Sequence, residues 1–436
     1  MSPRSTLAAS AALSLLLPAA RAQPSPVWGL NGAWEAVAAT GVGPQGSRWH
    51  SAATTAGSLY ITGGAGAAGN ATFQLDCATF TWTQLPPLPQ AYLAPALIAF
   101  GGLLLQVGGE TGFGASDEML LLSTTNSNGG WLAGAIPGAT FGPRNGHKMV
   151  AFGGNVYGMG GWDGQTYFND VFGLDLNSFI LNSTTASGAV AAWTPIVPNG
   201  AAGMWPARSA FSLDVYSAAL VIFGGIYANG PVNPSVRVLY NDAWYWVPSN
   251  VAQLAPLAAP GWTQFSATGV LPPCRYGHVA GVYGDQLFVF GGTTWDGCGA
   301  GPGGPTQLND LWALNLPAQV WGQVAASNPW PSPRGVPAGV FVGRHLYIMG
   351  GDGVSADTWR WAPSFLPSPS GGGGGGGSAV SGALGATATV AAGGAAAAAL
   401  FSFVAMSAAL LVLRRTMPAG ARGPTAAEMG TVYAQI

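Results

Sequence analysis

The sequence repeats one short pattern six times, and this repeat limits the possible folds more than any other feature. In each copy an apolar run of β-forming residues ends in a pair of glycines. The first glycines of the six pairs are Gly63, Gly108, Gly160, Gly224, Gly291 and Gly350, at intervals of 45, 52, 64, 67 and 59 residues. Self-similarity at such a period indicates structural units that stack against one another to bury their apolar faces.

Two further strands are predicted after the glycine pairs. The first alternates apolar residues, as in the stretch from Val171 to Leu176, and the second opens with a tryptophan in five copies. Those residues are Trp82, Trp131, Trp193, Trp262 and Trp321. This order of strands, glycine pair and tryptophan resembles the kelch repeat, in which each unit forms one four-stranded blade of a β-propeller. The resemblance covers about 330 residues and implies an all-β fold, a six-bladed kelch-type propeller.

Trp34 indicates how the propeller closes. The sixth copy has a third strand from Asp357 to Trp361 but no tryptophan-led strand after it. The segment that begins at Trp34 precedes the first glycine pair and belongs to no complete copy. We therefore expect this segment to form the outer strand of the sixth blade, because joining the first and last blades removes an open sheet edge.

The two ends of the chain predict a secreted protein with a membrane anchor. Residues 1–22 contain an apolar run and end in Ala-Arg-Ala, which has the form of a signal peptidase site. Residues 390–413 carry no charge, are long enough to cross a bilayer, and precede two arginines. These features predict a single-pass type I membrane protein of the plasma membrane or endomembrane system. The propeller, residues 23–366, would be extracellular or luminal, and residues 414–436 cytoplasmic.

Two shorter segments complete the predicted organisation. Residues 367–389 form a stalk rich in Pro, Ser and Gly, which has no capacity to bury a core. The chain ends in Tyr433-Ala-Gln-Ile436, which resembles the Tyr-x-x-Φ sorting signal that clathrin adaptors bind. A domain that binds free C-termini would suit the same residues, and an inert tail is the remaining alternative.

Five of the few basic residues in the predicted propeller fall at one place in the repeat. Sixteen residues before the first glycine stand Arg144, Arg208, Arg275 and Arg334, and Arg48 is one place out of register. A ring of guanidinium groups on one rim of the central channel would suit a carboxylate, phosphate or sugar ligand. Alternatively, each in-register arginine pairs with the aspartate that opens the third strand of its blade, and we favour this interpretation because buried charges are normally paired. Those aspartates are Asp170, Asp242, Asp310 and Asp357.

Two charges lack such a partner and are the stronger candidates for ligand contacts. They are Arg48 in blade one and Asp117 in blade two. Long loops are predicted from Ile226 to Tyr240 and from Thr293 to Leu308, and Trp295 in the second loop is a candidate stacking surface. The candidate ligand-binding set therefore comprises these three residues and the four in-register arginines.

No catalytic or metal centre stands out from the repeat. His50, His147 and His278 occupy one repeat position in blades one, three and five, so we expect them to lie apart and not to converge on a metal. Galactose oxidase and the nitrile-specifier proteins have similar propellers, but the residue patterns of their copper and iron sites are absent. We predict no cofactor and no enzymatic activity. A metal-dependent enzyme, oxidase-like or lyase-like, that uses the propeller channel is the alternative.

Composition excludes one class of partner. Only 7% of the residues are charged, with 14 Lys plus Arg against 16 Asp plus Glu, so the chain has no basic surface that could displace the counterions of a nucleic acid. We predict instead a recognition or adhesion module that binds a protein or glycan through its loops.

The cysteines and two sequons fit an oxidising compartment. Cys274 and Cys298 lie in two loops that emerge on the same face of a propeller, so a disulfide between them is predicted. Asn70 and Asn182 begin N-x-Thr or N-x-Ser/Thr motifs in predicted turns and are candidate glycosylation sites.

Overall fold

The described residues belong to the propeller. The computed structural model describes residues 30–365, except for residues 56, 66–68, 126–128, 134–140, 177–191, 230–232, 249–260, 300–302, 328 and 352–355. The chain divides into two units, Met1–Gly377 and Ser378–Ile436, and every described residue belongs to the first.

Several predictions from the ends of the chain concern residues beyond these ranges. The predicted signal peptide, stalk, membrane helix and cytoplasmic tail lie outside the described residues, as do Asn182, Tyr433 and Ile436. Within the described part of the chain, no apolar helix reaches the length needed to span a membrane.

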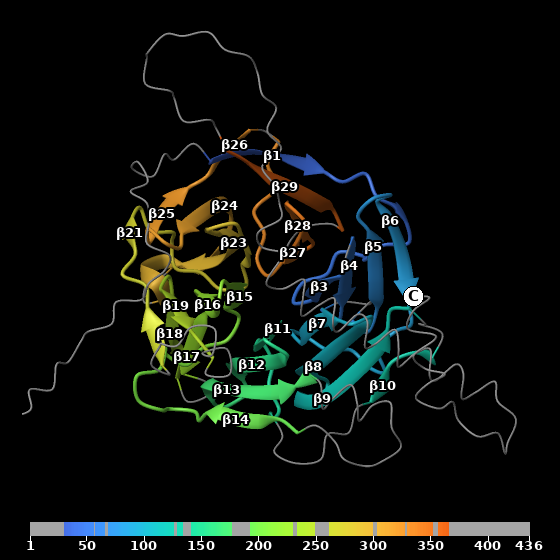
Figure 1. Cartoon of the computed structure of the whole chain (residues 1–436), viewed down its shortest axis with the longest axis horizontal. Helices are drawn as coiled ribbons and strands as arrows, with labels where there is room; N and C mark the ends of the chain where they lie inside the picture. Colours follow the sequence, from blue (N-terminus) through green and yellow to red (C-terminus); the bar gives the residue numbers. More distant parts are fainter. Residues whose placement is uncertain are drawn as a thin grey trace, which may run out of the picture. The chain divides into compact units, whose positions relative to one another are not determined.

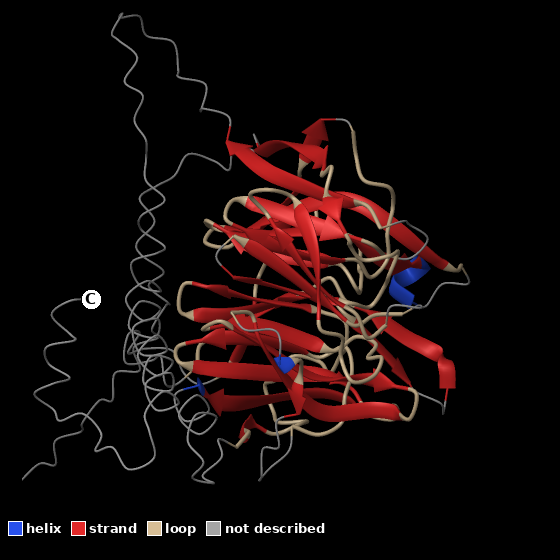
Figure 2. Cartoon of the chain, turned by 90° about the vertical axis from the view of Figure 1, so that its right-hand side faces the viewer, coloured by secondary structure: helices blue, strands red, loops and turns tan. Residues whose placement is uncertain are grey.

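Six sheets lie around one axis, and each is one blade of a β-propeller (Figure 1). Nearly all the regular structure is β-strand (Figure 2). From the innermost strand outward, blade one consists of β3 (Ser51–Thr55), β4 (Ser58–Thr62), β5 (Thr72–Asp76), β6 (Thr81–Leu85) and β2 (Thr40–Gly41). Blade two consists of β7 (Ala96–Phe100), β8 (Leu103–Thr111), β9 (Gly114–Ser123) and β10 (Leu132–Ala133). Blade three consists of β11 (Lys148–Phe152), β12 (Asn155–Trp162), β13 (Tyr167–Asp175) and β14 (Thr194–Val197).

The remaining three blades are larger. Blade four consists of β15 (Ser212–Tyr216), β16 (Ala219–Phe223), β19 (Ala243–Trp246) and β20 (Trp262–Gln264), with an added hairpin of β17 (Ile226–Asn229) and β18 (Asn233–Leu239). Blade five consists of β22 (Val279–Tyr283), β23 (Gln286–Trp295), β24 (Pro305–Asn315), β25 (Val320–Gln323) and β21 (Thr268–Gly269), with the 3₁₀ helix η3 (Asp296–Gly299) between β23 and β24. Blade six consists of β27 (Ala338–Val342), β28 (His345–Met349), β29 (Thr358–Phe365), β1 (Leu30–Ala36) and β26 (Ala325–Ser327). The predicted all-β, six-bladed propeller is confirmed.

The apolar core lies between neighbouring blades. One cluster joins Phe288 and Phe290 of blade five to Leu346 and Ile348 of blade six, and similar clusters join blades three to four, four to five, and six to one. The six innermost strands also contact one another in sequence around the ring, from β3 through β7, β11, β15, β22 and β27 back to β3. A blade therefore buries its faces only when both neighbours are present.

The glycine pairs connect each blade to the next through backbone hydrogen bonds. The second glycine of every pair has a φ between 92° and 112°, a conformation that favours glycine. In this conformation its N–H donates to the carbonyl of the residue at the repeat's arginine position in the following blade. The six bonds are Gly64 to Tyr92, Gly109 to Arg144, Gly161 to Arg208, Gly225 to Arg275, Gly292 to Arg334 and Gly351 to Ser47, at 2.8 to 3.0 Å. The last of them links blade six to blade one.

The N-terminal strand closes the ring, as the sequence predicted. β1 pairs antiparallel with β29, and Trp34 stands opposite Trp361. The Trp34 side chain is only 2% exposed, and its ring centroid lies 4.6 Å from that of Phe290 in blade five. The next strand, β2, then pairs with β6 of blade one, so the segment from 30 to 41 joins the outer edges of the first and last blades.

Candidate binding face

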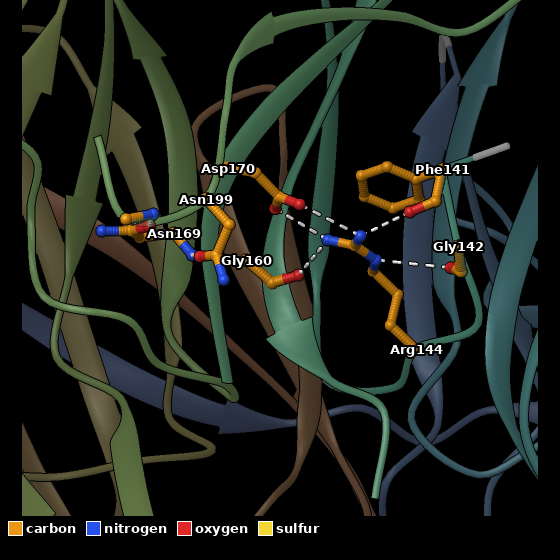
Figure 3. Close-up of polar contacts among 8 residues, drawn as sticks. Phe141, Gly142, Arg144, Gly160, Asn169, Asp170 and Asn199 are labelled. Atoms are coloured by element: carbon orange, nitrogen blue, oxygen red, sulfur yellow. Dashed lines mark hydrogen bonds and ion pairs between the residues drawn. The ribbon is translucent and has the colours of Figure 1, made fainter. Parts of the chain in front are cut away.

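Four arginines lie inside their blades, where each binds one aspartate. In blade three, Arg144 Nη1 and Nη2 donate to Asp170 Oδ1 and Oδ2 at 2.8 and 3.2 Å (Figure 3). The other N–H groups of Arg144 donate to the carbonyls of Gly160, Phe141 and Gly142. The same bidentate ion pair joins Arg208 to Asp242, Arg275 to Asp310 and Arg334 to Asp357, with Nη to Oδ distances of 2.5 to 3.0 Å.

This geometry corrects the candidate ligand-binding set. The four arginine side chains are at most 3% exposed, and each donates at least four of its five N–H groups within the propeller. Burial and pairing leave them no surface to offer a ligand. The structure therefore supports the interpretation in which each arginine pairs with an aspartate of its own blade. The four arginines are Arg144, Arg208, Arg275 and Arg334.

Blade two carries a different pair at the same place. Tyr92 occupies the arginine position, and its hydroxyl donates to Glu118 Oε2. Met119, the residue after Glu118, pairs with Val107, just as Val171 after Asp170 pairs with Met159. Glu118, not Asp117, is therefore the blade-two equivalent of Asp170. The sequence alone did not reveal this, because the assignment depends on the strand register. Asp117 is exposed on β9.

Blade one has neither member of the pair. The strand register places Ser47 and Ala71 at the two positions, and both side chains are buried. Arg48 is the next residue, and it is exposed. The sequence was therefore right that blade one departs from the pattern, and Arg48 stays a candidate for a surface contact.

The three histidines are packing residues between blades. His50, His147 and His278 lie against the first glycine of the preceding blade, where a Cβ on that glycine would approach each imidazole Cε1 to 2.8 Å. Burial lowers the pKa of His50 to about 4. Burial also lowers the pKa values of His147 and His278 well below the ordinary value, and a nearby arginine adds to the effect at each of these two. All three are neutral at physiological pH. Among the described residues, no group of three or more His, Cys, Asp or Glu side chains could hold a metal ion.

The two predicted long loops are extended hairpins that contact each other. In blade four the segment contains β17 and β18, and in blade five β23 and β24 continue past the glycine pair to η3. β18 contacts η3, and the Arg237 guanidinium lies 4.0 Å from the Trp295 ring centroid. We call the described residues of 226–239 and 293–308 the blade 4–5 projection. The interpretation of these segments as irregular loops was wrong, because their strand pairing continues the blades.

A disulfide fixes the blade-five half of this projection. Cys274, at the entry to blade five, is bonded to Cys298 in η3, with a Cα–Cα distance of 5.6 Å. The Trp295 indole N–H donates to the Gly303 carbonyl. Trp295 is therefore held in place with one face against Arg237, which leaves less of its ring for stacking than the sequence suggested. Cys77 is a half-buried free thiol.

Aromatic side chains gather at the same ends of the blades. Trp162 lies 5.9 Å from Tyr167, which lies 5.0 Å from Tyr227 of the projection. Trp49 of blade one and Tyr276 of blade five are 6.3 Å apart and nearly parallel. These five partly exposed residues, with the projection, form the surface that we call the binding face. Asn70 lies in a turn, and its amide donates to the Leu88 carbonyl at 3.4 Å.

Comparisons with known proteins agree with this architecture. A family model for the KLHDC2/KLHL20/DRC7 Kelch-repeats domain matches residues 192–362, and the Kelch motif model matches residues 143–177. The fold and these matches support the kelch β-propeller family. Kelch domain-containing protein 3 of Homo sapiens is 23% identical over 298 residues, which span 65% of this chain and 69% of that protein. Host cell factor 2 of Homo sapiens is 24% identical over 275 residues, which span 61% of this chain but 31% of that protein.

One carboxyl group on an innermost strand should make the stability of the propeller depend on pH. Asp214, on β15, accepts N–H bonds from Val215 and Val282, both at 2.6 Å. Burial nevertheless raises the pKa of Asp214 from 3.8 to about 6. The folded state then binds the proton more tightly than the unfolded state, so protonation of Asp214 stabilises the fold. This contribution is complete below about pH 4 and is lost as the pH rises through about 6.

Asp214→Asn should remove this dependence, because the amide does not ionise. Relative to the variant, the wild type should lose up to about 3 kcal/mol of unfolding free energy between pH 4 and pH 7. Denaturant unfolding of both proteins across this range measures the difference. Parallel stability profiles would show that Asp214 titrates normally.

Proposed function

We propose that this kelch propeller is a protein-binding module whose partner contacts the binding face. The observation that carries the proposal is the blade 4–5 projection, in which two hairpins from neighbouring blades are joined by the Arg237–Trp295 contact and fixed by a disulfide. A rigid projection lowers the entropic cost of binding a macromolecule. Tyrosine, tryptophan and arginine, which are present on this face, are also residue types enriched at protein interfaces.

The cellular location of the module is part of the proposal. From the sequence of its ends, we propose that the propeller is displayed outside the cell or in the lumen, on a stalk at residues 367–389 and a membrane helix at residues 390–413. The disulfide is compatible with such a compartment. The tail motif at Tyr433 and Ile436 would then offer a contact to a sorting adaptor.

Disrupting the blade 4–5 projection should abolish binding of the partner protein. The variant combines Arg237→Ala with Trp295→Ala, which deletes the contact between the two hairpins. Its matched control is Leu132→Ser on the outer strand β10 of blade two, which changes an exposed apolar side chain outside the blade 4–5 projection. Proximity labelling from the full chain in cells should lose a defined set of proteins with the double variant and retain it with the control.

Two outcomes would contradict this proposal. One is a set of labelled proteins that is the same for the double variant and the wild type. The other is saturable binding to a glycan array with no protein partner, which would make the face a lectin site. Near-ultraviolet circular dichroism of the double variant checks that the propeller itself is intact.

A further inference from the structure

The two halves of the Cys274–Cys298 disulfide lie in different surroundings. Cys274 is only 3% exposed. The next residue, Arg275, donates its Nε–H to the Pro273 carbonyl at 3.0 Å and pairs with Asp310, so the backbone around Cys274 is fixed in the blade. Cys298 is exposed and lies in η3. A thiol in solution can therefore attack the disulfide at Cys298, whereas burial hinders attack at Cys274.

The backbone of η3 is held in a conformation that is unfavourable for Cys298. Gly297, Cys298 and Gly299 have positive φ values of 59°, 56° and 103°. Glycine adopts such values readily, but the Cβ atom of a cysteine disfavours them. A strained residue persists only where its surroundings hold it there, and the bond to Cys274 is a covalent restraint of this kind. We expect the backbone at Cys298 to leave this conformation when the bond opens.

η3 is also the part of blade five that touches the hairpin of blade four. It contacts β18, and a Cβ on Gly299 would lie 2.6 Å from the Arg237 carbonyl oxygen, so the two backbones are in direct contact. Trp295, immediately before η3, lies against the Arg237 guanidinium. A change in the backbone of η3 therefore acts directly on the contact that joins the two halves of the blade 4–5 projection.

Strand pairing holds blade five together independently of the disulfide. β22 pairs with β23 along its whole length, and β23 pairs with β24. Between this ladder and the disulfide, Tyr276 and Thr293 exchange two backbone hydrogen bonds, both at 3.0 Å. Opening of the disulfide should therefore change the projection and leave the blade formed.

We propose that this disulfide is a redox switch, which holds the blade 4–5 projection closed when it is oxidised and opens it when it is reduced by a dithiol. One thiolate of the dithiol attacks the Cys298 sulfur, the bond to Cys274 breaks, and the Cys274 thiolate takes up a proton. The second thiolate then displaces Cys298 from the mixed disulfide, and Cys298 is protonated in turn. Two electrons pass to the protein, which gains two thiols, and the reductant ends as a disulfide.

Thiol labelling without denaturant tests which half of the disulfide becomes accessible. The full chain is treated with dithiothreitol, freed of the reductant and exposed to iodoacetamide, and alkylation at each cysteine is followed by mass spectrometry. Cys298 should react at least about tenfold faster than Cys274, because the reactivity of a thiol follows its exposure. Cys77, which is a free thiol before reduction, is the internal reference. A disulfide that dithiothreitol reduces only after the propeller unfolds would overturn the proposal, as would a Cys298 rate equal to or below that of Cys274.

Hydrogen–deuterium exchange tests the opening itself. Amides of β18 and η3 should exchange at least about tenfold faster in the reduced protein, while β22 and β25 exchange unchanged. Cys298→Ser should show the fast exchange without reductant. The matched control Cys77→Ser keeps the disulfide and should respond to dithiothreitol as the wild type does. A Cys298→Ser protein whose β18 and η3 exchange like the oxidised wild type would overturn the proposal.

The effect of this switch on partner binding rests on the proposed function and has a separate test. Proximity labelling with Cys298→Ser should lose the same proteins as the double variant of Arg237 and Trp295, and Cys77→Ser should retain them. If the projection opens and the labelled proteins are unchanged, the switch is confirmed and the proposed function is contradicted. If the projection stays closed, the switch is wrong whatever proteins are labelled.

Discussion

Removing residues 23–38 should lower the melting temperature of the propeller by about 10 °C. The deletion removes β1, exposes the edge of β29 and empties the space that Trp34 fills against Phe290 and Trp361. Loss of a buried tryptophan alone costs about 3–5 kcal/mol, and each kcal/mol corresponds to about 2–4 °C in a domain of 150–250 residues. Thermal unfolding followed by tryptophan fluorescence measures the effect.

A shorter deletion provides the matched control. Removing residues 23–29 leaves β1 intact and should not change the melting temperature. Gly32→Ala tests the same contact without deleting anything, because its Cβ would lie 2.1 Å from Trp361 Nε1 and force β1 away. If the protein lacking residues 23–38 has the same melting temperature as the wild type, the N-terminal strand does not close the ring.

Arg208→Ala should destabilise the propeller by about 3–5 kcal/mol, whereas Arg48→Ala should change its stability by less than about 1 kcal/mol. The first change leaves the Asp242 carboxylate without its buried partner, and the second removes an exposed side chain. Denaturant unfolding compares the two variants. Equal losses would remove the distinction between internal and surface arginines.

A double variant separates the ion pair from the space it fills. Arg208→Met combined with Asp242→Leu removes both charges and keeps most of the volume, and it should be far less destabilised than Arg208→Ala. If it is as unstable as the single variant, the loss comes from packing against Tyr240, whose ring centroid lies 3.6 Å from the guanidinium carbon.

The regular parts of this fold could be predicted because each copy repeats the same local signals. Six glycine pairs, a tryptophan for each outer strand and the surplus Trp34 were enough to predict the number of blades and the closing strand. The pairing of Arg208 with Asp242 could be predicted for a similar reason, since both residues recur together in four blades.

The irregular parts depended on register and on contacts between copies. Asp117 and Glu118 are adjacent acids, and only the pairing of Met119 with Val107 shows which one points to Tyr92. The extension of β23 past its glycine pair depends on pairing with β24 across a long insertion. The contact of Arg237 with Trp295 joins two copies, so no pattern within one copy predicts it.

Hydrogen–deuterium exchange of the full chain, with and without its purified partner, tests the binding face most directly. The account predicts that binding slows exchange at amides of β17, β18 and η3 and around Tyr276, while the outer strands β10, β14 and β20 exchange unchanged. Protection confined to those outer strands, with none in the blade 4–5 projection, would contradict it.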